Sequence, residues 1–503
     1  MSRPDDARVR DLITKAVALH QADDLVGAEA IYSEILAANP RQSDALYLQG
    51  TVRFQQNRHY EALDLLQKAL AENPNNIAAH NNLGKVFDGL GRWEESVASF
   101  ERALRLDPRD DAALCNIGIA ETWLGRAEAS ERHIRQSLAV NPASHATWSA
   151  LGYALYHQGH SREAEVAWRK TIELEPSFSE AHINLGTALL AQMNFVEGWT
   201  EFAWRDRLPD SRIGRVAFPQ RRWRGEDLRG NALLVIGDQG LGDQILCANL
   251  MPFLIERGVD LVIECEPRLV PLMARSFRAR VIPKSTPPMP ETQSTDISAK
   301  ADFVDLAETL IRHPNAFQRH GGYLKPDAAR VAQLRDKWLR KAAGRKVIGL
   351  TWASARVRLG PAKSSKLAAD WAPILKTPGA MFVSLQYGRP DGDLAEAAAA
   401  GLSIERDDTV DVTKDIDGLA ALIAAMDMVI SVSNSTVHLA GALNVPVWTL
   451  VPAGPGRLWY WFEGRDDSPW YPSMRLFRQA DYGVWAPLMT RVAAALPARL
   501  AGL

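Results

Sequence analysis

The chain has 503 residues, and its 58 basic residues stand against 60 acidic ones. A chain of this length is too long for a single hydrophobic core, so at least two domains are expected. The nearly balanced charge gives no electrostatic reason to expect nucleic acid or an anionic membrane surface as a partner.

The cysteines and the first residues indicate the compartment. Cys115, Cys247 and Cys265 show no metal-ligand or redox spacing, which is typical of buried thiols in a reducing compartment. The first ten residues lack the apolar segment of a secretory signal. No apolar run approaches the about 20 residues that span a bilayer. The sequence therefore predicts a soluble, cytoplasmic protein.

A 34-residue period organises the first third of the chain. Prolines preceded by Asn, Asp or Glu recur at this interval, at Pro40, Pro74, Pro108, Pro142 and Pro176. The period is typical of tetratricopeptide repeats, in which pairs of helices stack into a superhelix. Each proline is expected to end the second helix of a pair, because the residue before proline is pushed out of the α region.

Small and large apolar residues follow the same period. Glycines recur in the predicted first helices, at Gly50, Gly84, Gly118, Gly152 and Gly186. Large apolar residues recur in the second helices, at Leu66, Phe100, Ile134, Trp168 and Phe202. The pattern predicts an α-solenoid over residues 1–208 in which the two helices of each pair touch closely. Its sixth unit, from Ser179 to Leu208, is degenerate and is expected to meet the next domain.

Three asparagines, Asn82, Asn116 and Asn184, recur two residues before these glycines. A side-chain amide can both donate to and accept from a peptide backbone, so the three predict a ladder that binds an extended acceptor polypeptide. The alternative is that asparagine is simply common at this place in the repeat. Two units carry Leu48 and Ala150 there, so a ladder would be interrupted.

An arginine-rich stretch follows the solenoid, with Trp204 and Trp223 on either side. Its arginines are Arg205, Arg207, Arg212, Arg215, Arg221, Arg222, Arg224 and Arg229. Basic residues with aromatics are also found in nucleic-acid sites, but nothing else in the chain supports that interpretation. We expect instead that residues 209–230 form a junction that docks the two parts of the chain.

An α/β pattern covers residues 231–343. The apolar run 232–236 predicts a buried parallel strand, residues 244–257 a helix and residues 261–265 a second strand. This order of strand, helix and strand predicts a βαβ unit. Residues 283–300 are rich in Pro, Ser and Thr and are expected to form a mobile surface loop.

The turn between the first strand and its helix has the sequence Gly240-Leu-Gly-Asp243. Ligands of open parallel sheets bind beyond the carboxyl ends of the strands, where this turn lies. Gly240 and Gly242 let the backbone approach a ligand, and the helix N-terminus attracts negative charge. The alternative role for Asp243 is a helix-start carboxylate that complements the helix dipole.

A second α/β set covers residues 344–503. Its predicted strands are 346–352, 381–386, 428–432 and 445–451, and its predicted helices include 416–426, 436–443 and 484–496. The last of these helices is expected to return and brace the first half. The aromatic segment 459–462 is expected to pack in the core. The two sets together predict a pair of Rossmann-like domains that face a cleft.

Polar segments at the strand ends of this second set are candidates for donor binding. They contain Lys363 and Lys366, then Gln386 and Tyr387, and finally Asn434, Ser435, Thr436 and His438. Hydroxyls, helix N-terminal amides and an imidazole at one strand-to-helix turn suit a diphosphate and a ribose. The alternative for His438 is a helix-start residue that packs in the core.

Several segments together carry a family resemblance. They are residues 237–243, 347–352, 382–386, 431–444, 467–473 and the run from Trp199 to Trp223. With the repeats, they resemble bacterial tetratricopeptide proteins that carry a glycosyltransferase domain. That domain is similar to the heptosyltransferases and, more distantly, to protein O-GlcNAc transferase.

The resemblance implies a GT-B fold whose second half binds a nucleotide-sugar, with no metal ion and no other cofactor. In such a family Asp243 would take the proton of the acceptor hydroxyl. Lys363, Lys366 and His438 would neutralise the leaving diphosphate. One departure is Ser433, which stands where heptosyltransferase-like proteins commonly have Asp, and the lysines are displaced from the usual pattern.

The sequence as a whole predicts a protein O-glycosyltransferase that modifies Ser or Thr of a polypeptide held by the repeats. Similar bacterial proteins act on flagellin, which is therefore the first acceptor to test. Two alternatives remain open. One is a non-catalytic scaffold or chaperone with a degenerate transferase domain, and the other is a transferase for a lipopolysaccharide-type glycan.

Overall fold

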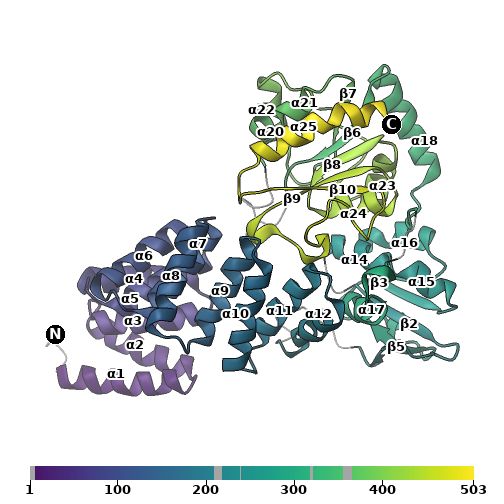
Figure 1. Cartoon of the computed structure of the whole chain (residues 1–503). Helices are drawn as coiled ribbons and strands as arrows, with labels where there is room; N and C mark the ends of the chain where they lie inside the picture. The colour runs from purple at the N-terminus through teal and green to yellow at the C-terminus, as the bar shows by residue number, and fades with distance from the viewer. Residues whose placement is uncertain (1–5, 209–217, 238–239, 318–320, 355–364) are drawn as a thin grey trace. The chain divides into compact units, whose positions relative to one another are not determined.

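The computed structural model describes residues 6–208, 218–237, 240–317, 321–354 and 365–503 (Figure 1). It divides into two compact units, Met1–Ser177 and Phe178–Leu503. The second unit begins before the predicted end of the solenoid, because the sixth helix pair packs on the α/β part. Each unit is described by itself.

The N-terminal unit consists of consecutive helices that pack in pairs, as the repeat period predicts. Its helices are α1 (Asp6–Gln21), α2 (Leu25–Ala38), α3 (Ser43–Gln55), α4 (His59–Glu72), α5 (Ile77–Gly89), α6 (Trp93–Leu106), α7 (Asp111–Trp123), α8 (Ala127–Val140), α9 (His145–His157) and α10 (Ser161–Leu174).

Local sequence fixes where the paired helices begin. The residues Gln42, Asn76, Asp110 and Ser144 precede the first helices at the repeat interval, and the side chain of each accepts a hydrogen bond from the third backbone N–H of its helix. Such caps satisfy amide groups that the helix itself leaves without partners. The cap therefore repeats together with the proline two residues before it.

The recurring glycines are sites of close helix contact. A Cβ atom on Gly84 would lie 2.6 Å from the ring of Phe100, and one on Gly152 would lie 2.6 Å from the indole of Trp168. Since real Cβ atoms do not approach other atoms so closely, each large side chain lies directly on the backbone of the facing helix. This confirms the predicted pairing of small and large residues.

The C-terminal unit starts with α11 (Ser179–Ala191), α12 (Phe195–Phe202) and the short 3-10 helix η1 (Ala203–Arg207). The indole Nε1 of Trp199 donates to the carbonyl of Ile311 at 2.8 Å, and Phe195 packs edge-on against Phe317. The sixth repeat thus packs its apolar face on the following α/β part, as its degenerate sequence predicts.

The first sheet has five parallel strands in the order β1-β5-β2-β3-β4. Its strands are β1 (Arg221–Arg222), β2 (Ala232–Ile236), β3 (Leu261–Cys265), β4 (Arg280–Pro283) and β5 (Ile297–Ala301). Strands β2 and β3 have the bounds that the sequence predicts. Its helices are α14 (Leu241–Ala248), α15 (Met251–Glu256), α16 (Val270–Ser276), α17 (Phe303–Leu310) and α18 (Ala328–Ala342), with η2 (Pro267–Leu269), η3 (Pro290–Gln293) and η4 (Pro314–Ala316) between them.

Two predictions for this half are wrong. Residues 283–300 are not one loop, because they include η3 and most of β5, which lies between β1 and β2. The β5 sequence, Ile-Ser-Ala-Lys-Ala, does alternate apolar and polar residues as a half-buried strand should. The prediction missed this pattern because the strand is short and directly follows a stretch rich in Pro, Ser and Thr. The helix predicted at 244–257 is two helices, and Pro252 stands in the first turn of the second one.

The second sheet also has five parallel strands, in the order β10-β9-β8-β6-β7. Its strands are β6 (Lys346–Thr351), β7 (Ala380–Ser384), β8 (Met428–Val432), β9 (Val447–Val451) and β10 (Met474–Arg478). The sequence predicts four of them within two residues and misses β10. Its helices are α20 (Leu367–Asp370), α21 (Ala372–Leu375), α22 (Asp391–Ala399), α23 (Ile416–Ala424), α24 (Ser435–Ala442) and α25 (Ala486–Ala501), with η6 (Gly454–Gly456) and η7 (Trp459–Trp461).

The last helix does not brace the first half, contrary to the prediction. Helix α25 lies on the second half, where it packs on α21 and β10 (Figure 1). Its Leu488, Val492 and Leu496 join the core that contains Trp371 and Ile374. Its apolar stripe therefore covers one face of the second sheet, which would otherwise be exposed to water.

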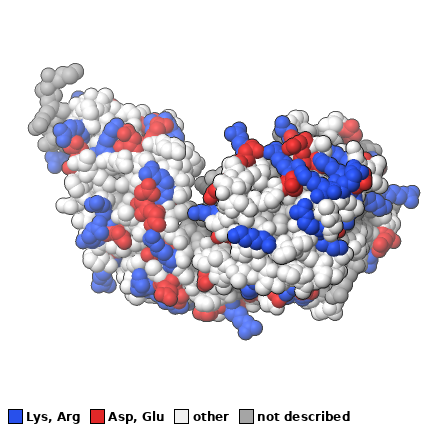
Figure 2. Space-filling view, turned by 90° about the horizontal axis from the view of Figure 1, so that it is seen from above, with Lys and Arg blue, Asp and Glu red and all other residues white. Residues whose placement is uncertain are grey.

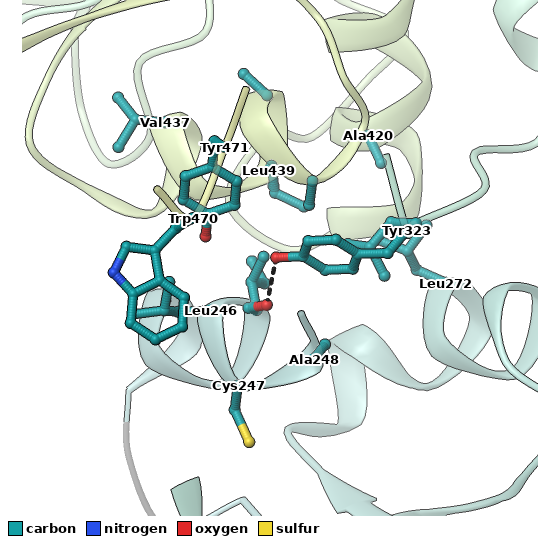
Figure 3. Packing of buried hydrophobic residues seen from close by; sticks show 14 of the residues in the cluster. Leu246, Cys247, Ala248, Leu272, Tyr323, Ala420, Val437, Leu439, Trp470 and Tyr471 are labelled. Carbon is teal, nitrogen blue, oxygen red and sulfur yellow. Dashed lines mark hydrogen bonds between the residues drawn. The ribbon is translucent and has the colours of Figure 1, made fainter. Parts of the chain in front are cut away.

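The two α/β halves share one hydrophobic core. Helix α14 packs against α24, and α18 packs against α23. The Tyr323 hydroxyl donates to the carbonyl of Ile245 in α14 at 2.7 Å, beside Tyr471 and Trp470 of the second half (Figure 3). The amide of Asn249 donates to the carbonyl of Trp470 at 3.0 Å. Both halves are therefore held together by packing and by buried hydrogen bonds.

Two of the junction arginines form ion pairs with the first half. Arg205 lies 2.5 Å from Asp302, and Arg222 lies 2.5 Å from Asp305 and 3.0 Å from Glu308. Arg222 also belongs to β1, which pairs with β5. These arginines join η1 and β1 to the first sheet and its helix α17 within the C-terminal unit. The predicted junction residues Arg212 and Arg215 lie outside the described residues.

Charges of both signs are interspersed on the face that Figure 2 shows, in keeping with the balanced composition. Within the described part of the chain, no helix combines the length and the apolar character that a membrane span requires.

Candidate functional site

Each sheet reverses its strand order at one point. In the first sheet β3 and β4 follow on one side of β2, and β5 lies on the other side. In the second sheet β7 lies on one side of β6, and β8 lies on the other. Ligands of open parallel sheets bind beyond the strand ends at such switch points. The segment after β2 leads into α14 and the segment after β8 leads into α24, and these helices pack together.

A cavity of about 380 Å³ lies between the halves at this place. This volume is within the range of small-molecule sites. Its described lining residues are Gly240, Leu241, Gly242, Asp243, Arg268, Ser354, Tyr387, Val412, Thr413, Ile416, Leu419, Ser433, Asn434, Ser435, His438, Leu458 and Tyr460.

The cavity brings together predicted site residues from both halves. Gly240, Gly242 and Asp243 come from the start of α14. Tyr387, Asn434, Ser435 and His438 come from the segments after β7 and β8. These two groups are far apart in the sequence, so their meeting depends on the packing of the two halves.

Other predicted donor-binding residues do not line the cavity. Lys366 is exposed at the N-cap of α20, and Thr436 is fully buried in α24. Gln386 is buried, and its side-chain oxygen Oε1 accepts from the backbone N–H groups of Trp352 and Ala353 at 2.9 and 3.0 Å. Gln386 thus holds the chain where it leaves β6. Lys363 lies outside the described residues.

Asn434 fixes the start of α24. Its Oδ1 accepts from the Thr436 backbone N–H at 2.9 Å, which caps the helix. Its Nδ2 donates to the hydroxyl of Thr351 at 2.9 Å and to the carbonyl of Ala353 at 3.2 Å. One side chain therefore ties the N-terminus of α24 to the end of β6, at the switch point.

Ser433 accepts a hydrogen bond from the Trp461 indole Nε1 at 2.8 Å. Both side chains are buried. A hydroxyl at this position gives the indole N–H a partner inside the core, which a buried donor requires. The aromatic segment after β9 therefore packs directly behind the cavity wall, and its Tyr460 lines the cavity.

His438 is both packed and part of the cavity wall. Its Nδ1 is hydrogen-bonded to the Tyr471 hydroxyl at 2.9 Å, and its ring stacks on Trp461 with centroids 5.1 Å apart. Burial raises the pKa of Tyr471, so this phenol keeps its proton. A Cβ atom on Gly242 would lie 3.0 Å from His438 Cδ2, a tight contact, so the glycine helps α14 to lie close to the imidazole.

Asp243 stands in the first turn of α14, where the helix dipole favours a carboxylate. It lines the large cavity and also a narrow one, of about 10 Å³, that extends toward Cys247 and Glu264. Both interpretations of Asp243, as a dipole-complementing residue and as a group at a ligand site, therefore fit its position.

Sequence reasoning missed several lining residues, above all Arg268, Ser354, Thr413 and Tyr460. Arg268 lies in η2, just after β3. A basic residue that directly follows a predicted strand is a pattern from which the sequence could have identified it as a site residue. Ser354 begins the polar segment that the sequence singled out for its lysines, although Ser354 itself was not chosen as a site residue. Thr413 gave no comparable signal.

The predicted asparagine ladder lies partly in each unit. Asn82 on α5 donates to the hydroxyl of Thr51 on α3 at 2.9 Å, so it links consecutive repeats. Asn116 on α7 is half-buried. Asn184 is half-buried on α11 of the C-terminal unit. The Asn82 amide is thus partly engaged within the array.

Among the residues that the structure describes, no group of three or more His, Cys, Asp or Glu side chains is arranged to hold a metal ion.

Comparison with known proteins identifies the repeats and one relative. Residues 41–109 and 149–198 each match a tetratricopeptide repeat family. The chain is 37% identical to Protein FlbA of Caulobacter vibrioides over 328 residues, which are 62% of this chain and 54% of FlbA. The match therefore spans about half the length of that relative.

Two solved structures are similar to the repeats. One is TTC0263, a thermophilic tetratricopeptide protein of Thermus thermophilus, with 21% identity, a TM-score of 0.33, and coverage of 36% of this chain and 99% of that chain. The other is YrrB, a tetratricopeptide protein with an unusual peptide-binding site, with 22% identity, a TM-score of 0.30, and coverage of 34% and 88%. The N-terminal part of this chain thus carries tetratricopeptide repeats, and the chain is homologous to FlbA.

Proposed function

We propose that the C-terminal unit is a glycosyltransferase of the GT-B type that modifies a polypeptide bound by the repeats. The observation that carries this proposal is the cavity between two parallel α/β halves. In it Asp243 of the first half is brought together with Asn434, Ser435 and His438 of the second. The resemblance of both segments to glycosyltransferase motifs supports the same conclusion.

The cavity is suited to a nucleotide-sugar. The N-termini of α14 and α24 both border it, and each carries the partial positive charge of a helix start. Amide groups and dipoles of this kind stabilise a diphosphate without a metal ion. Apolar side chains, including Leu241, Val412 and Leu458, complete the wall and limit the access of water.

In the proposed reaction, the hydroxyl oxygen of a Ser or Thr of the acceptor bonds to C1 of the sugar. Its proton passes to the carboxylate of Asp243. The bond between C1 and the diphosphate oxygen breaks, and its electron pair stays on the diphosphate. Asp243 is therefore the proposed general base, and the start of α24 receives the leaving group.

The repeats are the proposed acceptor-binding part. Arrays of this kind commonly bind peptides or protein partners. The half-buried amides of Asn116 and Asn184 are candidates for contacts to an extended backbone. Flagellin in the cytoplasm is the first acceptor to test.

The test is the intact mass of flagellin co-expressed with this protein in a host that supplies the native nucleotide-sugars. We expect a sugar-sized mass increment with the unaltered protein and none with Asp243→Asn, which keeps the size of the side chain but cannot take a proton. The matched control is Asp260→Asn, at an exposed position just before β3 of the same half. Full modification by the Asp243→Asn protein would refute the assigned role.

A second candidate is a non-catalytic scaffold. It is favoured by the arrangement around Ser433, which the Trp461 indole engages, and by the exposed position of Lys366. On this view the repeats bind their partner and the cavity binds no nucleotide-sugar. Complex formation without any mass increment, and a thermal midpoint that nucleotide-sugars leave unchanged, would support the scaffold.

A further inference from the structure

Among the residues that the structure describes, few charged side chains line the cavity. Of its described lining residues, only Asp243 and Arg268 carry a Lys, Arg, Asp or Glu side chain. The predicted phosphate-binding Lys366 is exposed and does not line the cavity. Within the described part of the chain, an anionic ligand here therefore meets one arginine rather than a group of lysines.

The first half fixes the segment that carries Arg268. The buried Gln244, next to Asp243 in α14, accepts through Oε1 from the backbone N–H of Glu266 at 2.8 Å. This bond ties the end of β3 to the helix that carries the proposed base. Arg268 follows two residues later, in η2, so its position relative to Asp243 is set by this contact.

The guanidinium of Arg268 is held from both halves. Its Nε donates to Oε1 of Glu266 at 2.9 Å, and its Nη1 donates to the carbonyl of Thr413 at 2.7 Å. These two bonds orient the plane of the guanidinium before any ligand arrives. A side chain that is already oriented loses less conformational entropy when it binds.

The remaining N–H donors of Arg268 define its ligand. A guanidinium has five N–H groups. In Arg268, one on Nε and one on Nη1 donate to described residues, so both N–H groups of Nη2 can donate to a ligand. Its planar fork matches two oxygens of a phosphate. The side chain is about two-fifths exposed, at 39%, so a ligand in the cavity can reach it.

We propose that Arg268 binds the diphosphate of the nucleotide-sugar and carries its negative charge as the sugar leaves. The inference rests on the proposed function and adds a residue to it. Arg268 takes the part that the sequence assigned to Lys366, and the other predicted lysine, Lys363, lies outside the described residues. Because the contact is to phosphate oxygens, it does not depend on the base of the nucleotide.

Arg275 provides a matched control. It also reaches from the first half to the second, since its Nη1 donates to Asp417 at 3.2 Å, and its Nε donates to the carbonyl of Lys325 at 3.0 Å. It does not line the cavity. Replacing Arg275 therefore disturbs the contact between the halves without removing a charge from the cavity.

The experiment is titration calorimetry of the full chain with UDP, GDP, ADP, CDP and dTDP, and with the matching nucleoside. We expect the unaltered protein to bind at least one nucleoside diphosphate. Arg268→Gln should weaken that binding about 10- to 100-fold, and Arg268→Lys should weaken it less, because a charge-assisted pair of hydrogen bonds is lost or reduced. Arg275→Gln should change it by less than about twofold, and the nucleoside should bind both Arg268 variants as it binds the unaltered protein.

Other outcomes separate the two proposals. Unchanged diphosphate binding by Arg268→Gln would overturn the role of Arg268 and leave the proposed function standing. Equal weakening by Arg268→Gln and Arg275→Gln, or equal weakening for the nucleoside, would show that Arg268 only holds the halves together. Absence of binding by the unaltered protein to all five diphosphates would contradict both proposals.

Discussion

At the scale of single residues, His438 shows that a side chain packed in the core can also line a cavity. Its ring is 2% exposed and stacks on Trp461, yet it lines the cavity beside Gly242. The sequence placed a core histidine and a ligand-binding histidine as alternatives. The structure shows that the two alternatives do not exclude each other, because a cavity between two packed halves is lined by residues that also form their core. The ligand-binding role stays a prediction.

Asp88 in α5 gives a prediction at this scale. Burial raises its pKa to about 7, against the opposing effects of Ser96 and Lys85. A raised pKa means that the folded state favours the protonated acid. Its contribution to stability is therefore complete below the unfolded pKa of about 4 and is lost as the pH rises through about 7.

We expect Asp88→Asn to remove this pH dependence, because the amide cannot ionise. Relative to the unaltered protein, the variant should gain about 2–4 kcal/mol of unfolding free energy at pH 8 and little at pH 4. Calorimetric midpoints between pH 4 and pH 8 measure the effect. Asp64→Asn, at an exposed ion pair with Lys68, is the control. A gain of the same size at both pH values would contradict the prediction.

At the scale of elements, the repeat helices are specified by residues close in sequence, whereas several strands are not. The caps, the prolines and the glycines lie within each 34-residue unit, so the helix pairs could be predicted. Strand β5 is short and follows a stretch rich in Pro, Ser and Thr, so its alternating pattern was missed, and the structure places it between β1 and β2. Strand β10 pairs only with β9 among the described strands, and Arg475 and Arg478 interrupt its apolar residues, so it gave little signal.

Gly84 gives a prediction at the element scale. Alanine in a helix interior is ordinarily about 1 kcal/mol better than glycine. At Gly84 the added methyl would meet the ring of Phe100, so Gly84→Ala should instead destabilise the protein by about 1–3 kcal/mol. The thermal midpoint measures the loss, and Phe100→Leu in the same chain should restore part of it.

Gly392 is the control for this substitution. It lies in α22 with open space where a Cβ atom would be added, so Gly392→Ala should be neutral or stabilising. If Gly84→Ala also proved neutral, the close contact between helices α5 and α6 would not limit stability.

At the scale of the whole C-terminal unit, ion pairs join the last repeat to the first sheet. Arg222 meets Asp206, Asp305 and Glu308, and burial together with Asp302 raises the pKa of Asp305 to about 7. Arg222 counteracts this rise. Without it, several half-buried carboxylates would lack their cation.

We expect Arg222→Met to cost about 3–5 kcal/mol of unfolding free energy at pH 8, because it leaves carboxylates without a partner. The cost should be smaller at pH 5, since Asp305 then takes up a proton. Urea unfolding at the two pH values tests this. Arg221→Met, at a more exposed ion pair, should cost less than about 1 kcal/mol. Equal losses for the two variants would contradict the prediction.

The sequence by itself determined the tetratricopeptide array, six of the ten described strands and the two strand-to-helix turns at the cavity. Period, glycine and cap signals are local, so no distant contact is needed to find them. Only the tertiary structure decided which turns meet, where α25 packs and which cation borders the cavity. Arg268 is held by a carbonyl 145 residues away along the chain, and contacts of that range arise only when the two halves pack.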